Sequence, residues 1–175
     1  MNINTIIVDN FLDNPLKVRE SALALDITRS GSYPGFRSDR ADKDYEQYVQ
    51  SKIETILGTP VTEWKQDSLQ FQLCLKDEKT WIHHDDTDWA AVLFLTPDAP
   101  AGAGTGIFRH IPTGITTSSA DVDIHDDNWE LITAVGNVFN RLVLYRGYLY
   151  HKSLISGFGT DINSGRLTQV FFFNT

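Results

Sequence analysis

The chain has 175 residues, of which 41% are hydrophobic and 22% are charged, and its formal net charge is −8. These values predict a single globular domain over 1–175 with a sizeable core. The excess of acidic residues argues against an extended nucleic-acid-binding surface, although a local basic groove is compatible with it. The only cysteine is Cys74, which excludes an internal disulfide and a cysteine-based zinc cluster.

The N-terminal ten residues lack both a basic segment and a long apolar segment, so they predict no signal peptide. No apolar run in the sequence reaches the length that crosses a bilayer. We therefore expect a cytoplasmic protein that has no membrane partner. The sequence does not indicate whether the protein is a monomer or an oligomer.

Residues 1–60 predict one strand followed by two helices. The strand covers 5–8, and the first helix runs from Pro15 to about residue 25, with Asn14 as its N-cap. Helical spacing of apolar residues predicts the second helix over 43–57, where a glycine and a proline follow. We interpret 33–37, which contains Pro-Gly, as a turn connecting the helices, with a contribution to the site as the less favoured alternative.

From residue 61 onward the apolar residues recur with a period of two, which is typical of strands. Strands are expected over 69–75, 142–145 and 167–173, and the continuous apolar run 90–95 predicts a strand buried on both faces. We also expect a short helix over 126–134. The overall pattern predicts a mainly β, α+β fold: a β-sandwich or barrel with helices packed outside.

A long polar segment, 110–127, is expected to form a functional loop that overhangs a site. His110 and His125 flank this loop and are interpreted as surface residues. Gln72, Tyr145 and Tyr150 are candidate pocket residues, but the sequence does not orient their side chains.

The segment His83-His84-Asp85-Asp86 carries candidate metal ligands. On an extended chain, residues i and i+2 point the same way, so His83 with Asp85, or His84 with Asp86, can aim at one metal. A solvated turn capped by aspartate side chains is an equally good interpretation of this segment alone.

His151 is a candidate third ligand. It follows the strand 142–145 and a hairpin-like segment, 146–148, so we expect it at the start of a strand antiparallel to the preceding one. Two histidines and one carboxylate form the facial triad that leaves open positions on a non-haem Fe(II).

Arg166 opens the last predicted strand and shares its face with Thr168 and with apolar residues further along. An arginine on such a face requires an anionic partner unless it reaches solvent at the strand end. A guanidinium matches a carboxylate bidentately, and Thr168 can add a hydroxyl donor. Because the interval from His151 to Arg166 is long, Arg141 is the alternative anchor unless the glycine-rich segment 157–165 forms an enlarged loop.

The ordered set His83-x-Asp85, His151 and Arg166-x-Thr168 resembles the Fe(II)/2-oxoglutarate-dependent oxygenase superfamily, prolyl-hydroxylase-like branch. Segments 89–95 and 104–108 resemble the apolar strand and the glycine-rich segment that follow His-x-Asp there. The resemblance covers roughly 60–175.

This resemblance implies a double-stranded β-helix core over 61–175, with a strand and two helices from 1–60 packed on one sheet. It implies that His83, Asp85 and His151 are catalytic ligands of Fe(II), and it favours them over His84 and Asp86. The implied cosubstrate is 2-oxoglutarate, bound by Arg166 and Thr168, with ascorbate as a candidate reductant.

The implied activity is hydroxylation of a C–H bond in a small molecule or a peptide, and the sequence does not identify the substrate. Two other interpretations stay open. One is a non-catalytic β-sandwich that binds a metal or another ligand, and the other is a cupin-like metalloenzyme without 2-oxoglutarate.

Overall fold

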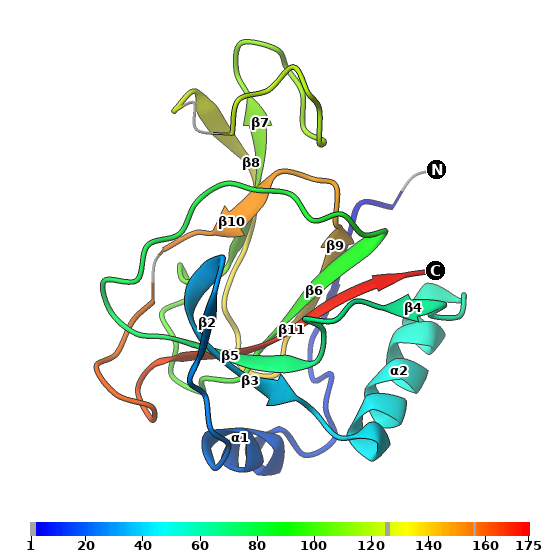
Figure 1. The fold of residues 1–175 in the computed structure, drawn as a ribbon, viewed down its shortest axis with the longest axis vertical. Coiled ribbons are helices and arrows are strands. Elements are labelled where there is room, and N and C mark those ends of the chain that lie inside the picture. Colours follow the sequence, from blue (N-terminus) through cyan, green and yellow to red (C-terminus); the bar gives the residue numbers. More distant parts are fainter. Residues whose placement is uncertain (1–2, 125–126, 156) are drawn as a thin grey trace.

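The computed structural model describes residues 3–124, 127–155 and 157–175, whose strands pair antiparallel in two sheets (Figure 1). The large, eight-stranded sheet runs in the order β1 (Thr5–Val8), β9 (Leu142–Arg146), β6 (Trp89–Phe94), β11 (Arg166–Asn174), β5 (Gln70–Cys74), β3 (Tyr33–Arg40) and β2 (Arg29–Gly31), with β4 (Glu63–Trp64) also paired to β11. The second sheet has the order β10 (His151–Ser153), β7 (Thr105–His110) and β8 (Trp129–Val135). The fold is the predicted double-stranded β-helix.

Two helices, α1 (Pro15–Leu23) and α2 (Lys43–Leu57), form where the sequence predicts them. Asn14 caps α1, and Pro15 occupies its first turn, where the missing N–H is not needed. The Asp42 carboxylate accepts a hydrogen bond from the Tyr45 N–H at the start of α2. Gly58 ends α2 in the left-handed conformation, with φ of 69°.

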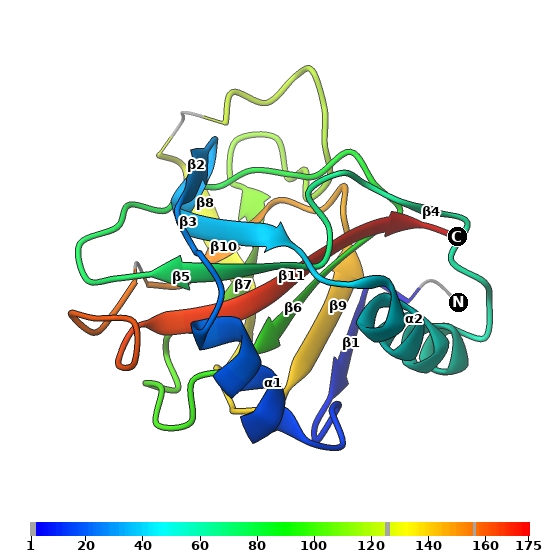
Figure 2. The ribbon, with the colours of Figure 1, turned by 60° about the horizontal axis from the view of Figure 1, so that its bottom comes forward.

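Both helices cover the same face of the large sheet, as the resemblance implied (Figure 2). Ala22 from α1 and Val49 and Ile53 from α2 are fully buried against this face. The sheet contributes large apolar side chains to this core: Phe71, Leu73, Leu93, Leu142, Leu144, Leu167, Phe171 and Phe173. The helix layer covers this face of the large sheet, and the opposite face is left for a site.

The strand β6 is buried on both faces, as its continuous apolar run predicted. Ala91 and Leu93 belong to the core under the helices, whereas Ala90 and Phe94 belong to a second core between the two sheets. Ile107 on β7 contributes to this second core from the small sheet.

The segment 33–37 is not the predicted connecting turn, because it belongs to strand β3. Phe36 pairs with Leu73 and Arg37 with Gln72 on β5. Gly35 permits this pairing: its φ is 69°, and a Cβ there would lie 2.1 Å from the carbonyl oxygen of Leu73. The first sixty residues therefore add three strands, β1 to β3, to the large sheet, instead of the single strand expected.

The predicted helix over 126–134 is also wrong where the structure describes it. Residues 129–135 form strand β8, which pairs with β7. Trp129, Ile132 and Thr133 have side chains that favour strands, and this preference outweighs the weak helical pattern. Residue 126 and His125 lie outside the described residues.

His151 opens a strand, but β10 pairs with β7 in the small sheet and not with the preceding strand β9. The chain therefore crosses from one sheet to the other between Arg146 and His151. His110 is buried rather than on the surface, with 5% of its area exposed, because its ring packs against Trp129. Within the described residues, no helix has the length and apolar character that a bilayer crossing requires.

Candidate metal centre

A backbone bridge places two histidines side by side. The N–H of His83 donates to the carbonyl of His151 at 3.0 Å, and the N–H of His151 donates back at 2.8 Å. An antiparallel pair of this kind projects its two side chains to the same face. The ring centroids of His83 and His151 are accordingly 4.3 Å apart.

Asp85 joins this pair because it lies two residues after His83 on an extended segment. The N–H of Asp85 donates to the carbonyl of Gly147 at 2.8 Å, which fixes the segment against the chain leading into β10. Gly147 allows this close approach, since a Cβ there would lie 2.3 Å from the hydroxyl of Thr87. One ligand atom from each of His83, Asp85 and His151 lies within 4.8 Å of the other two.

The hydrogen bonds of both imidazoles leave one nitrogen of each free for a metal. Nδ1 of His83 lies 3.1 Å from the carbonyl oxygen of Trp81, and Nδ1 of His151 lies 2.8 Å from that of Leu149. A carbonyl oxygen only accepts, so each Nδ1 carries a hydrogen, and the lone pair of each neutral imidazole is on Nε2. This is the arrangement that orients metal-binding histidines.

The carboxylate of Asp85 lacks a hydrogen-bond partner for one buried oxygen. Oδ2 lies 3.3 Å from Nε2 of His151, but no hydrogen bond satisfies it among the described residues. Two lone pairs that face each other at this distance repel unless a proton or a cation lies between them. A divalent cation therefore fits this set of donors, and neutral imidazole and carboxylate are the ligands that Fe(II) accepts in facial triads.

The ionisation states also favour a cation. Burial, followed by the neighbouring charge of His151, lowers the pKa of His83 to about 4, so this imidazole is neutral at pH 7. Burial alone would raise the pKa of Asp85, but its contact with His151, with a smaller contribution from the charge of Arg37, holds it below the ordinary value. The site thus offers neutral imidazole and an ionised carboxylate.

The alternative pair of ligands lies outside this cluster. His84 and Asp86 are both exposed, and the His84 ring packs against the edge of Tyr150 at 5.7 Å. Asp86 lines the adjacent cavity but does not belong to the cluster of ligand atoms.

A cavity of about 810 Å³ adjoins the triad and lies between the two sheets. Arg166 and Thr168 line it, together with Val170 and Phe172 from the same face of β11, as the sequence predicted. Arg166 is 4% exposed, and its Nε donates to the carbonyl of Ala103 at 3.2 Å. No carboxylate lies within ion-pair distance of it among the described residues, and burial lowers its pKa.

Arg141, the alternative anchor, does not line this cavity. Its guanidinium forms a bidentate ion pair with Asp9, with N–O distances of 2.6 and 2.9 Å. Among the described residues of 157–165, the structure shows a loop closed by Asp161 and Ser164, which accounts for the long interval before Arg166.

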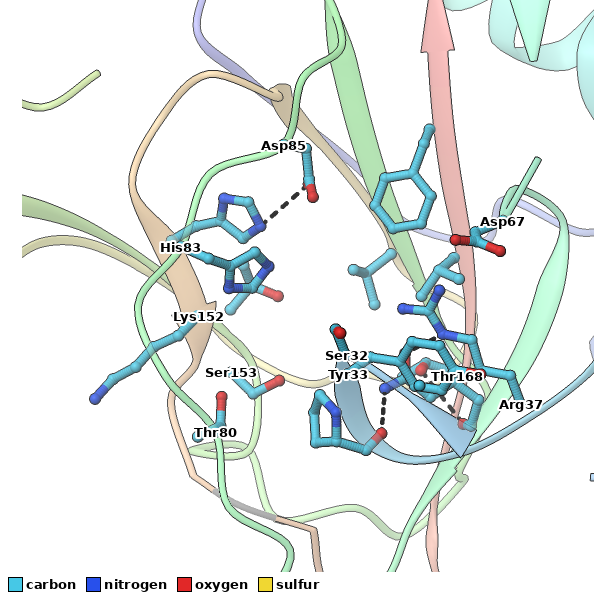
Figure 3. Close-up of a pocket in the computed structure, with 18 of the residues that line it drawn as sticks. Ser32, Tyr33, Arg37, Asp67, Thr80, His83, Asp85, Lys152, Ser153 and Thr168 are labelled. Carbon is cyan, nitrogen blue, oxygen red and sulfur yellow. Dashed lines mark hydrogen bonds and ion pairs between the residues drawn. The ribbon is translucent and has the colours of Figure 1, made fainter. Parts of the chain in front are cut away.

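Of the candidate pocket residues, Gln72 and Tyr145 line the cavity. Tyr150 does not, because it is fully buried in a separate cluster under the loop that follows β7. Tyr33 and Arg37 reach the cavity from β3, whereas the sequence favoured a connecting turn for their segment over a contribution to the site (Figure 3). The sequence did contain one indication of this position: Arg37 is a charged residue two positions after Gly35, the glycine that lets β3 approach β5.

Comparison with known proteins identifies the family. The sequence matches a family of unknown function, DUF6445, over residues 2–126 and 122–173. The chain belongs to this family. No curated protein matches this DUF6445 member.

Solved structures similar to this DUF6445 chain include three that each align with 97% of it. HygX from Streptomyces hygroscopicus, with nickel, 2-oxoglutarate and hygromycin B bound, has a TM-score of 0.66 at 10% identity over 82% of its chain. A Pseudomonas putida prolyl-4-hydroxylase has a TM-score of 0.52 at 15% identity over 91% of its chain. A Trichoplax adhaerens prolyl hydroxylase bound to a hypoxia inducible factor peptide has a TM-score of 0.55 at 11% identity over 83%. At these identities the likeness supports the fold.

Proposed function

We propose that this protein is an Fe(II)- and 2-oxoglutarate-dependent dioxygenase that hydroxylates a C–H bond of a small molecule or a peptide. The observation that carries the proposal is the buried Asp85 carboxylate oxygen, which has no hydrogen-bond partner among the described residues and faces Nε2 of His151 at 3.3 Å, with His83 beside it. HygX, which shares this fold, binds nickel and 2-oxoglutarate. That likeness supports the proposal independently of the site geometry.

His83, Asp85 and His151 would hold the metal through Nε2, a carboxylate oxygen and Nε2. The backbone bridge between His83 and His151 sets the spacing of the two rings before any metal binds. Fe(II) together with 2-oxoglutarate supplies the activation of O2 and the oxidation of the C–H bond. The protein supplies fixed ligands and a cavity lined from both sheets.

Arg166 and Thr168 would bind the distal carboxylate of 2-oxoglutarate. The guanidinium is buried with no carboxylate partner in the part of the chain that the structure describes, so an anionic ligand would relieve the cost of its burial. Tyr145 lines the same cavity, and burial raises the pKa of its hydroxyl well above the ordinary value. The hydroxyl therefore stays protonated and can donate a hydrogen bond to a ligand oxygen.

The proposal is tested by a calorimetric titration of 2-oxoglutarate into the protein with and without Co(II), followed by assay of succinate with Fe(II) in air. We expect 2-oxoglutarate to bind far more tightly to the Co(II)-loaded protein and succinate to form only with Fe(II). Metal binding without any 2-oxoglutarate binding would contradict the proposal and would favour a non-catalytic metal-binding sandwich or a cupin-like enzyme.

A further inference from the structure

The cavity contains a second buried guanidinium, Arg37, which the proposed binding of metal and 2-oxoglutarate does not use. Its side chain extends from β3 and is 7% exposed. Figure 3 shows it across the cavity from His83 and Asp85, beside Tyr33. A positive charge is thus held in the wall that faces the candidate metal site.

The neighbours of Arg37 fix the direction of its guanidinium. Cζ lies 3.9 Å from the ring centroid of Tyr33 and 5.6 Å from that of Phe172. Nε donates to Oε1 of Gln72 at 3.3 Å. The amide nitrogen of Gln72 donates to the carbonyl of Pro34 at 2.6 Å, so its oxygen is turned toward Arg37. This positioning engages Nε and leaves the two terminal nitrogens of the fork for a ligand.

Arg37 has no carboxylate partner among the described residues. Asp67 and Asp85 favour its charged form only through longer-range attraction, and neither lies within 4.0 Å of it. Burial lowers the pKa of Arg37. By contrast, Arg29 at the rim of the same cavity is paired with Asp39. Burying a guanidinium that is hydrogen-bonded only to a neutral amide costs free energy, and an anionic ligand would lower that cost.

We propose that Arg37 binds a carboxylate of the organic substrate, so that the substrate class is an acid with an apolar body. The terminal nitrogens of a guanidinium match the two oxygens of a carboxylate. Val92, Val170 and Phe172 line the cavity next to this charge and would contact the apolar body. The inference rests on the proposed function, in which Arg166 is occupied by 2-oxoglutarate and Arg37 stays free for a second anion.

The size of the cavity is compatible with two ligands. Its volume of about 810 Å³ lies in the upper part of the range of roughly 300–1,000 Å³ found for small-molecule sites. Asp67, Asp85 and Asp86 also line this cavity, but no carboxylate of the described residues lies within ion-pair distance of Arg37 or Arg166, so both buried guanidinium groups favour an anionic ligand.

The test uses benzoate and benzamide, which have nearly the same shape and differ in charge. Each is titrated calorimetrically into protein loaded with Zn(II) and saturated with 2-oxoglutarate. We expect benzoate to bind at least about tenfold more tightly than benzamide, because a carboxylate forms a charge-assisted pair with the guanidinium. The difference disappears in Arg37→Gln and persists in the control variant Arg29→Gln, which changes a rim arginine that is already paired.

A second measurement on the wild-type protein covers the case in which Arg37→Gln does not fold. The Nε–H resonance of Arg37, assigned by its loss in Arg37→Lys, shifts with benzoate and stays in place with benzamide. Equal affinity for the two probes, unchanged benzoate binding in Arg37→Gln, or a resonance that does not move with benzoate would overturn the inference.

The affinity for 2-oxoglutarate separates this inference from the proposed function. Arg37→Gln is expected to leave that affinity nearly unchanged. A large loss would show that Arg37 anchors the cosubstrate and would overturn the inference while the proposed enzyme class survives. If 2-oxoglutarate does not bind at all and benzoate still requires Arg37, the proposed function fails and the carboxylate subsite stands.

Discussion

The two faces of strand β11 differ in what their buried side chains contact. Leu167, Phe171 and Phe173 point toward the helices and are fully buried in an apolar core. Arg166 and Thr168, on the opposite face, line the cavity between the sheets. Arg166 and Thr168 each donate one hydrogen bond to a backbone carbonyl, but the Arg166 guanidinium has no carboxylate within ion-pair distance among the described residues.

This difference indicates a division of roles within one strand. The helix face contributes to stability through apolar burial, and the cavity face carries the buried charge of Arg166, for which the described residues supply no carboxylate. Substitutions on the helix face should therefore lower the free energy of unfolding, whereas substitutions on the cavity face should weaken ligand binding. The predictions below test that separation.

The largest effect on stability is expected from Phe171→Ala, with its neighbour Phe172→Ala as the matched variant. Phe171 is 0% exposed and packs against Trp64, so its loss leaves a cavity and should lower the free energy of unfolding by about 3–5 kcal/mol. Phe172 faces the cavity and is only partly buried, so about 1 kcal/mol is expected. Urea unfolding of the metal-free proteins measures both values. Equal losses would refute the division between the faces.

Asp85→Ala is expected to weaken Co(II) binding by more than about 100-fold, because even outer partners of metal ligands contribute about 10- to 100-fold. The same change should not reduce the stability of the metal-free protein, since it removes a buried carboxylate oxygen that has no hydrogen-bond partner. Calorimetry with His84→Ala and Asp86→Ala as controls checks the choice of ligands. Loss of binding in these two controls, with Asp85→Ala unaffected, would mean that His84 and Asp86 are the ligands.

The smallest effect is expected from Asp42→Ala, which removes the N-cap of α2 on the helix side. The carboxylate accepts one hydrogen bond at the start of that helix, and its loss should cost about 1 kcal/mol of stability. Co(II) affinity should be unchanged, because α2 does not contribute to the cavity. A clear drop in Co(II) affinity without a change in stability would show that the two faces are coupled.

Those parts of the fold that repeat a local pattern could be predicted from the sequence. Helix α2 has apolar residues at helical spacing, a capping aspartate and a terminal glycine, and β6 has a continuous apolar run. The failed predictions concern segments whose state depends on distant partners. Residues 129–135 form strand β8 because they pair with β7. Residues 33–40 form strand β3 because Gly35 lets them approach β5.

The candidate site follows the same rule. His83 and Asp85 are two residues apart, so the shared direction of their side chains could be predicted from local geometry alone. Their proximity to His151 depends on a backbone bridge between residues 68 positions apart in the sequence, which the resemblance implied and periodicity could not reveal. A place for Arg37 in the site was the less favoured interpretation because its segment was assigned to a turn, and only pairing with the distant strand β5 makes it a strand.

The central claim is that Arg166 anchors 2-oxoglutarate at a metal held by His83, Asp85 and His151. The most direct measurement is an anaerobic titration of 2-oxoglutarate into the Fe(II) protein, followed by the metal-to-ligand charge-transfer absorbance. The wild-type protein and Arg141→Ala should give the same band and the same affinity, because Arg141 is paired with Asp9 away from the cavity. Arg166→Ala should lower the affinity for 2-oxoglutarate by about 100-fold or more, while the affinity for Fe(II) is retained. An unchanged titration in Arg166→Ala, or no band in the wild-type protein at millimolar 2-oxoglutarate, would contradict the claim.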